Sequence, residues 1–266
     1  MAATDRHRLR ATFEGVAELY DRARPSYPGE VFDDLVDVTG LGAGARILEI
    51  GCGTGQATRA LAERGFEVVA VELGAQLAAL ARTNLAAFDG VEVVNGVFET
   101  WEPERAGFDA AVSFTAFHWI DPDARFGKVA CLLREDGALA IFEAPHVLPE
   151  GADPFWAEVQ EDYDAVVPHP DNRPPPRPDE VSDLAAEIDA SGYFHTVAVR
   201  RRLWEVTYTP DEYIALLGTF SPNLALDEVT RGRLFERIHR RIAEQPGGTV
   251  TKTRLGILNV ARRLER

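Results

Sequence analysis

Short apolar runs alternate with Ala- and Leu-rich stretches through the middle of this chain. Runs of Val, Ile, Leu and Ala that are bounded by Gly, Pro, Asp or Asn are typical of buried strands, and the stretches between them favour helices. The pattern predicts strands at 46–50, 67–72, 91–95, 108–113 and 137–143, with helices at 56–64, 75–87 and 122–133. Strands that alternate with helices predict a parallel sheet with helices on both faces.

Two further regions flank this alternation. Before it, residues 11–22 and 29–38 have helical periodicity, and after it a proline-rich, acidic stretch occupies 146–178. The rest of the pattern predicts helices at 155–166, 180–190, 210–217 and 226–244 and strands at 195–208 and 249–260. The last two strands would close the sheet as a hairpin, with the helices between them as a lid. The predicted fold class is therefore α/β: a Rossmann-like, doubly wound, mostly parallel seven-stranded sheet with an antiparallel last strand and helical lid insertions.

We expect a single domain over residues 1–266, because no stretch is loose enough to act as a linker between independent domains. Within it, residues 1–40 would form an N-terminal helical lid and residues 41–145 a ligand-binding core. Residues 146–266 would supply the substrate-side loop, the lid helices and the last strands.

Composition is that of an ordinary globular protein, with 45% hydrophobic and 27% charged residues. No apolar run approaches the ~20 residues of a membrane-spanning helix, and residues 1–10 lack the apolar core of a signal peptide. We therefore expect a cytoplasmic protein with no membrane partner. The net charge of −15 argues against a nucleic-acid partner, because phosphate backbones need a positive face. Cys52 and Cys131 stand alone, so reduced thiols and no metal site are expected.

Residues 49–55, Glu-Ile-Gly-Cys-Gly-Thr-Gly, end the first predicted strand and are the most informative stretch. Glycines at alternate positions let the backbone turn at positive φ and approach a ligand closely, and the helix that follows offers free N–H groups. A dinucleotide fingerprint, G-x-G-x-x-G, would need a glycine where this chain has Gln56. The spacing therefore favours a nucleotide-like ligand other than a dinucleotide.

With Glu49 two residues before the first glycine, E-x-G-x-G-x-G resembles motif I of the class I S-adenosylmethionine (SAM)-dependent methyltransferases. Residues 20–28 resemble the lid segment of small-molecule methyltransferases of the trans-aconitate type (methyltransferase type 11). Residues 113–121 resemble the "FHW-D" segment of the same subgroup. The resemblance covers roughly residues 12–145, and it implies SAM as the cofactor and a small molecule as the methyl acceptor.

The same resemblance places a set of residues around the cofactor. Glu72 ends the second predicted strand, where a carboxylate can accept hydrogen bonds from both ribose hydroxyls. Arg24 would pair with the carboxylate of the cofactor. Val97 stands where the family commonly has an aspartate, so we expect Val97 and Phe98 to frame the adenine by backbone and ring contacts. The full predicted set is Tyr20, Arg24, Tyr27, Glu49, Gly51, Cys52, Gly53, Gly55, Glu72, Leu73, Val97, Phe98, Ser113, Phe114, His118 and Trp119.

His118 is the candidate general base, because an imidazole with an ordinary pKa of about 6.5 can take a proton near neutrality. His146 is a second candidate, and the aromatic residues Phe155, Trp156, Tyr163, Tyr213 and Phe220 are candidates for the wall of the acceptor pocket.

The implied reaction is methyl transfer from SAM, with O-methylation of a carboxylate or hydroxyl favoured over C- or N-methylation. Two alternatives stay open: a SAM-binding protein that transfers no methyl group, and a nicotinamide-dependent oxidoreductase, which Gln56 disfavours. The expected assembly is a monomer or a homodimer.

Overall fold

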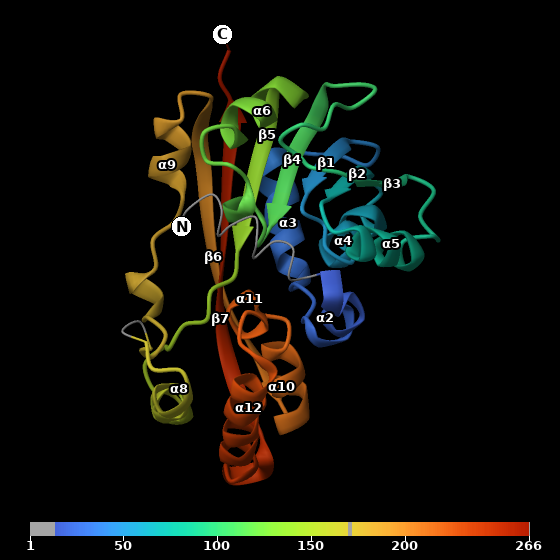
Figure 1. Cartoon of the computed structure of the whole chain (residues 1–266). Coiled ribbons are helices and arrows are strands. Elements are labelled where there is room, and N and C mark those ends of the chain that lie inside the picture. The colour runs from blue at the N-terminus through green and yellow to red at the C-terminus, as the bar shows by residue number, and fades with distance from the viewer. Residues whose placement is uncertain (1–13, 170–171, 266) are drawn as a thin grey trace.

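The computed structural model describes residues 14–169 and 172–265, and its strands form one mixed sheet (Figure 1). The strand order is β3-β2-β1-β4-β5-β7-β6. Strands β1 to β5 run parallel, whereas β7 pairs antiparallel with both β5 and β6. The strands are β1 (Arg46–Ile50), β2 (Glu67–Glu72), β3 (Val91–Asn95), β4 (Phe108–Phe114), β5 (Leu133–Glu143), β6 (Phe194–Tyr208) and β7 (Val250–Arg263). The predicted fold class, with seven strands and an antiparallel last strand, is confirmed.

Helices cover both faces of the sheet. Helices α3, α4 and α5 pack on one face, and α6 and α9 pack on the other. None of the helices in the two described ranges is long and apolar enough to cross a bilayer. The helices are α2 (Ala17–Ala23), α3 (Gly29–Thr39), α4 (Gln56–Glu63), α5 (Ala75–Asn84), α6 (Arg125–Leu132), α7 (Phe155–Glu158), α8 (Gln160–Val166), α9 (Ala185–Ala190), α10 (Pro210–Leu217), α11 (Ser221–Leu224) and α12 (Glu228–Ala243).

The apolar runs of the central strands follow from this double cover. Successive side chains of a strand point to opposite faces of the sheet. In β1, Ile47 packs with α3 and α4, whereas Leu48 and Ile50 pack with α6 on the other face. A strand that is covered on both sides must be apolar at successive positions, so its sequence shows no alternation.

Strands β6 and β7 extend past the sheet to a separate helical layer, which we call the lid (Figure 1). In this layer α7, α8, α10 and α12 enclose an apolar cluster that includes Tyr208 and Val250 at the ends of the two strands. Asp162 of α8 is 3% exposed. Its carboxylate accepts hydrogen bonds from Nε of Arg237 at 3.0 Å and Nε of Arg241 at 2.5 Å. This buried carboxylate therefore ties α8 to α12.

Several predicted boundaries are wrong, and the first part of the predicted helix at 11–22 lies outside the described residues. The helix predicted at 180–190 begins only at Ala185, because Asp183 caps the N–H of Ala185 and the N–H of Leu184 donates to Asn259 of β7. The helix predicted at 155–166 is divided at Val159 into α7 and α8. Helix α11 was not predicted, since four residues show no periodicity.

We expect Asp162→Asn to lower the free energy of unfolding by about 1–3 kcal/mol, because two guanidinium groups lose their buried acceptor. Both arginines are partly exposed, which limits the loss. Urea denaturation measures the change. The matched control is Glu236→Gln, which removes an exposed pair with Arg240 one turn apart on α12 and should cost less than about 0.5 kcal/mol. Equal losses in the two variants would contradict this role for Asp162.

Candidate active site

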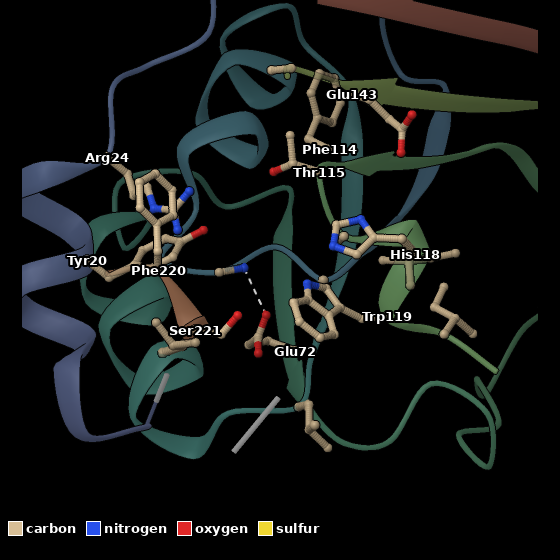
Figure 2. A pocket seen from close by; sticks show the side chains of 18 of the residues that line it. Tyr20, Arg24, Glu72, Phe114, Thr115, His118, Trp119, Glu143, Phe220 and Ser221 are labelled. Carbon is tan, nitrogen blue, oxygen red and sulfur yellow. Dashed lines mark hydrogen bonds between the residues drawn. The ribbon is translucent and has the colours of Figure 1, made fainter. Parts of the chain in front are cut away.

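A cavity of about 590 Å³ opens at the carboxyl ends of the central strands (Figure 2). The chain passes from β1 outward to β2 and β3 and then returns to β4 on the other side of β1, so the strand order reverses at this point. Ligands of open α/β sheets bind at such a reversal. Residues from the lid and from the segment around α2 complete the wall, including Tyr20, Arg24, Phe220, Ser221 and Pro222.

The glycine turn after β1 forms the floor of the cavity. Gly51, Gly53 and Gly55 have φ values of 75°, 58° and 96°, a region that disfavours other residues. A Cβ atom on Gly51 would lie 2.5 Å from Cβ of Ala116, so the turns after β1 and β4 touch backbone to side chain. Gly51 and Gly53 line the cavity. Gly55 instead faces Leu85, whose Cδ1 would lie 2.8 Å from an added Cβ.

Glu72 connects the end of β2 to this turn. Its Oε2 accepts the N–H of Gly53 at 2.9 Å, and its Oε1 accepts the N–H of Gly74 at 2.8 Å. The side chain faces the cavity, and the residue is 8% exposed (Figure 2). A carboxylate has about four lone-pair sites on two oxygens, which is the acceptor chemistry that two neighbouring hydroxyls of a ligand require.

Glu49 is more deeply buried than Glu72 and does not line the cavity. Burial raises its pKa to about 7, and the nearby charge of Glu72 acts in the same direction. Its Oε2 has no hydrogen-bond partner among the described residues.

The segment after β4 carries the aromatic wall. Thr115 has a φ of 54°, and its hydroxyl lies 3.1 Å from the hydroxyl of Tyr27. The ring centres of His118 and Trp119 are 4.9 Å apart, and both residues line the cavity. His118 is an exposed residue, but partial desolvation of its ring by the surrounding wall lowers its pKa, and the charge of Arg125 lowers it further. The His118 imidazole is therefore neutral at pH 7 and can accept a proton.

Arg24 bridges the segment after α2 and the lid. Its guanidinium lies 4.8 Å from the ring centre of Tyr20 and 4.5 Å from that of Phe220. Its Nε donates to the Thr219 hydroxyl at 2.9 Å and one Nη donates to the Thr219 carbonyl at 3.0 Å. Figure 2 shows Tyr20, Arg24 and Phe220 together on one side of the cavity, with His118 and Trp119 on the other.

Ten of the residues predicted from the sequence line the cavity: Tyr20, Arg24, Gly51, Gly53, Glu72, Leu73, Phe98, Phe114, His118 and Trp119. The other predicted residues, Tyr27, Glu49, Cys52, Gly55, Val97 and Ser113, lie outside its wall. Ser113 donates to the carbonyl of Ile50 at 2.9 Å and so joins β4 to β1. The roles of all the predicted residues in binding a cofactor, whether or not they line the cavity, remain predictions.

The sequence analysis missed several lining residues, and the polar or charged ones among them are Thr115, Glu143, Ser221, Lys252 and Arg254. Glu143 ends β5, so the rule that ligands bind at the carboxyl ends of strands could have found it. Burial raises the pKa of Glu143, and the charge of Glu187 adds to this effect. Lys252 and Arg254 stand at alternate positions of the last predicted strand, a spacing that places both on one face.

His146, the second candidate base, also lines the cavity. Its ring packs edge-on against Trp156, with the ring centres 4.2 Å apart. Burial lowers the pKa of His146 to about 2, and the charges of Lys252 and Arg254 contribute. A group with so low a pKa is neutral at every physiological pH, and it is a weak base.

Comparison with known proteins gives a family match over the core of the sheet. Residues 47–137 match the family described as "Methyltransferase domain". An uncharacterized methyltransferase of Mycobacterium tuberculosis is 34% identical over 136 residues, which are 51% of this chain and 53% of that protein. The trans-aconitate 2-methyltransferase of Mycobacterium marinum is 34% identical over 98 residues, 36% of this chain and 35% of that protein. The chain thus spans about half the length of the first relative and about a third of the length of the second.

Solved structures share the fold at low sequence identity. A protein from Anaeromyxobacter dehalogenans aligns with a TM-score of 0.62 at 22% identity, over 90% of this chain and 97% of its own. A SAM-dependent methyltransferase from Thiobacillus denitrificans, solved with S-adenosylhomocysteine, aligns with a TM-score of 0.53 at 17% identity, over 91% and 94% of the two chains. The [4+2]-cyclase SpnF aligns with a TM-score of 0.52 at 17% identity, over 90% and 83%. These alignments concern the fold alone.

We expect Gly51→Ala to lower the free energy of unfolding by more than the cost of placing an alanine at a positive φ. The left-handed conformation alone costs an alanine about 1–2 kcal/mol, and the contact with Ala116 should add about 1–3 kcal/mol. Gly44→Ala is the matched control, because Gly44 has a φ of 79° and an added Cβ there meets nothing within 4 Å. Denaturant unfolding of both variants gives the difference. Equal losses would show that the turns after β1 and β4 tolerate separation.

Proposed function

We propose that residues 47–137, which match a methyltransferase domain, form a class I SAM-dependent methyltransferase domain, and that the chain uses it to transfer a methyl group from SAM to a small-molecule acceptor. The observation that carries the proposal is the position of Glu72. Its carboxylate is fixed by two backbone N–H groups beside a glycine turn that carries no side chains, and the residue lines the cavity. A ribose with two free hydroxyls matches this acceptor.

The residues of the cavity fit the other parts of SAM as well. Phe98 and Leu73 offer apolar contact for an adenine ring beside Glu72. Gly51 and Gly53 leave backbone without side chains next to the methionine part. Arg24 uses Nε and one Nη for Thr219, so its other Nη can donate to the cofactor carboxylate. The volume of about 590 Å³ lies in the range of small-molecule sites.

When bound, SAM supplies a methyl carbon that its sulfonium has already activated. The protein must hold the acceptor atom in line with that carbon and exclude water. Trp119, Phe114 and Phe220 give the cavity an aromatic wall that serves the second task. Neutral His118 can take the proton of a hydroxyl acceptor, whereas a carboxylate acceptor is already ionised and needs no base.

We propose oxygen as the methylated atom, in a carboxylate or a hydroxyl. One cavity must hold both the cofactor and the acceptor, so the acceptor is a small molecule. A cytoplasmic location, a monomeric or homodimeric state and the absence of a nucleic-acid partner remain predictions from the sequence.

Two measurements test the proposal. Calorimetric titration with SAM, S-adenosylhomocysteine and NAD should show binding of the first two only. Incubation with methyl-tritiated SAM and a panel of carboxylic and hydroxy acids should then give a labelled product, and base treatment releases volatile methanol only from methyl esters. Binding of NAD without SAM would overturn the assignment of the cofactor. Binding of SAM with no transfer to any acceptor would overturn the reaction.

We expect Glu72→Gln to weaken SAM binding by about 10–100-fold, because hydrogen bonds to a charged acceptor contribute about 1.5–3 kcal/mol. Calorimetry measures the dissociation constant. The control is Glu67→Gln at the exposed beginning of the same strand, which should bind SAM like the unmodified protein. An unchanged affinity in Glu72→Gln would remove the ribose contact from the proposal.

We expect His118→Asn to lower kcat by ~10²–10⁴ with a hydroxyl acceptor, because general-base catalysis contributes rates of this size. The Kd for SAM should change little. Since the pKa of His118 is lowered and the base acts in its neutral form, kcat of the unmodified protein should fall only below about pH 6.5. His195→Asn, at an exposed position of β6, is the control. A kcat equal to that of this control would reduce His118 to a wall residue.

A further inference from the structure

Two buried cations of β7 face the lid side of the cavity. Lys252 and Arg254 are two residues apart on one strand, so their side chains point to the same side of it. They are 6% and 8% exposed, and both line the cavity. Lys252 is one of only two lysines in the chain, against 26 arginines, and the other, Lys128, lies on α6 and pairs with Glu102.

Neither cation has a negative partner among the residues that the structure describes. The Nη1 of Arg254 donates to the Ala144 carbonyl at 3.1 Å, while its Nε is buried and lacks an acceptor within the described ranges. Burial holds the pKa of Lys252 well below its usual range, and the charges of Arg254 and Arg24 lower it further. Cations that are buried together without an anion are unfavourable, so this arrangement is incomplete as it stands.

Aromatic rings fix the ammonium group in place. The Nζ of Lys252 lies 5.5 to 5.7 Å from the ring centres of Trp156, Tyr213 and Phe220. The faces of such rings attract a cation but do not neutralise it. Next to them, the Nε2 of His146 is buried and has no partner among the described residues. Because His146 is neutral, it can donate or accept one hydrogen bond without changing the charge of the site.

We propose that Lys252 and Arg254 form an anion subsite that binds a carboxylate group of the methyl acceptor. This inference rests on the proposed function, because it takes the acceptor to share the cavity with SAM. The Nε and Nη2 edge of Arg254 matches the two oxygens of a carboxylate, and the ammonium of Lys252 adds a point charge. The same charges repel a protonated amine, so the subsite excludes cationic acceptors.

Calorimetry with matched ligand pairs tests the subsite. Succinate, glutarate and benzoate are titrated against succinamide, glutaramide and benzamide, and inorganic phosphate is the further arm. Each titration is done with and without saturating S-adenosylhomocysteine. We expect at least one carboxylate to bind and its amide to bind more than ~30-fold more weakly, since an unpaired buried charge costs this much. No preference for carboxylates, or a preference for phosphate, would overturn the subsite.

Variants separate this inference from the proposed function. Lys252→Met keeps an unbranched side chain among the three rings, and we expect it to weaken carboxylate binding by ~30-fold or more while the Kd for S-adenosylhomocysteine changes less than ~2-fold. Lys128→Met is the matched control and should bind carboxylates normally. If S-adenosylhomocysteine fails to bind the unmodified protein, the proposed function fails, and the titrations without it still decide the subsite. Carboxylate binding that is equal in Lys252→Met and Lys128→Met would overturn the role of Lys252.

A third measurement needs no variant at the site. Protein labelled with ¹³Cε-lysine gives two lysine signals, which Lys128→Arg assigns. At a fixed pH, the carboxylate that binds most tightly in calorimetry should move the Lys252 signal toward the position of a protonated lysine and leave the Lys128 signal in place. A Lys252 signal that does not respond to a bound carboxylate would overturn the proposal.

Discussion

One buried carboxylate determines the shape of the cavity. Glu72 accepts the N–H of Gly53 from the turn after β1 and the N–H of Gly74 from the turn after its own strand. These bonds hold the two turns at a fixed separation, because both donors meet the same group. The glycine turn also packs closely against Ala116, in the segment that follows β4. Three strand ends are thus positioned through close contacts, and the cavity is the space that remains between them.

The wall of the cavity carries charges of both signs. Glu72 and Glu143 are its carboxylates, and Arg24, Lys252 and Arg254 are its cations. These cations belong to a chain whose net charge is −15, so the overall charge is a poor guide to the local field. A wall with both signs favours a ligand that presents hydroxyls to a carboxylate and an anion to the cations.

The lid depends on the length of β6 and β7. Both strands are longer than the other strands of the sheet. Their far ends pack into the apolar cluster that α7, α8, α10 and α12 enclose. Arg24 reaches from the segment after α2 to Thr219, so the lid is joined to the opposite wall. Tyr20 and Phe220 enclose the same guanidinium. The cavity is therefore closed by segments that lie far apart in the chain.

The sequence by itself determined the alternation of strands and helices, the mixed seven-stranded sheet, and the glycine turn and the acid that line the cavity. These features depend on local physics: apolar runs, glycines at alternate positions and an acid at the end of a strand, which all act within a few residues. Helix boundaries such as Ala185 were not predictable, because Asn259 of a distant strand competes for a backbone N–H. Tertiary structure decided that Lys252 and Arg254 line the cavity. It also decided that Tyr27 and Val97, which the sequence placed at the site, do not line it. Long-range packing sets which face of β7 meets the lid, and no short stretch of sequence contains that information.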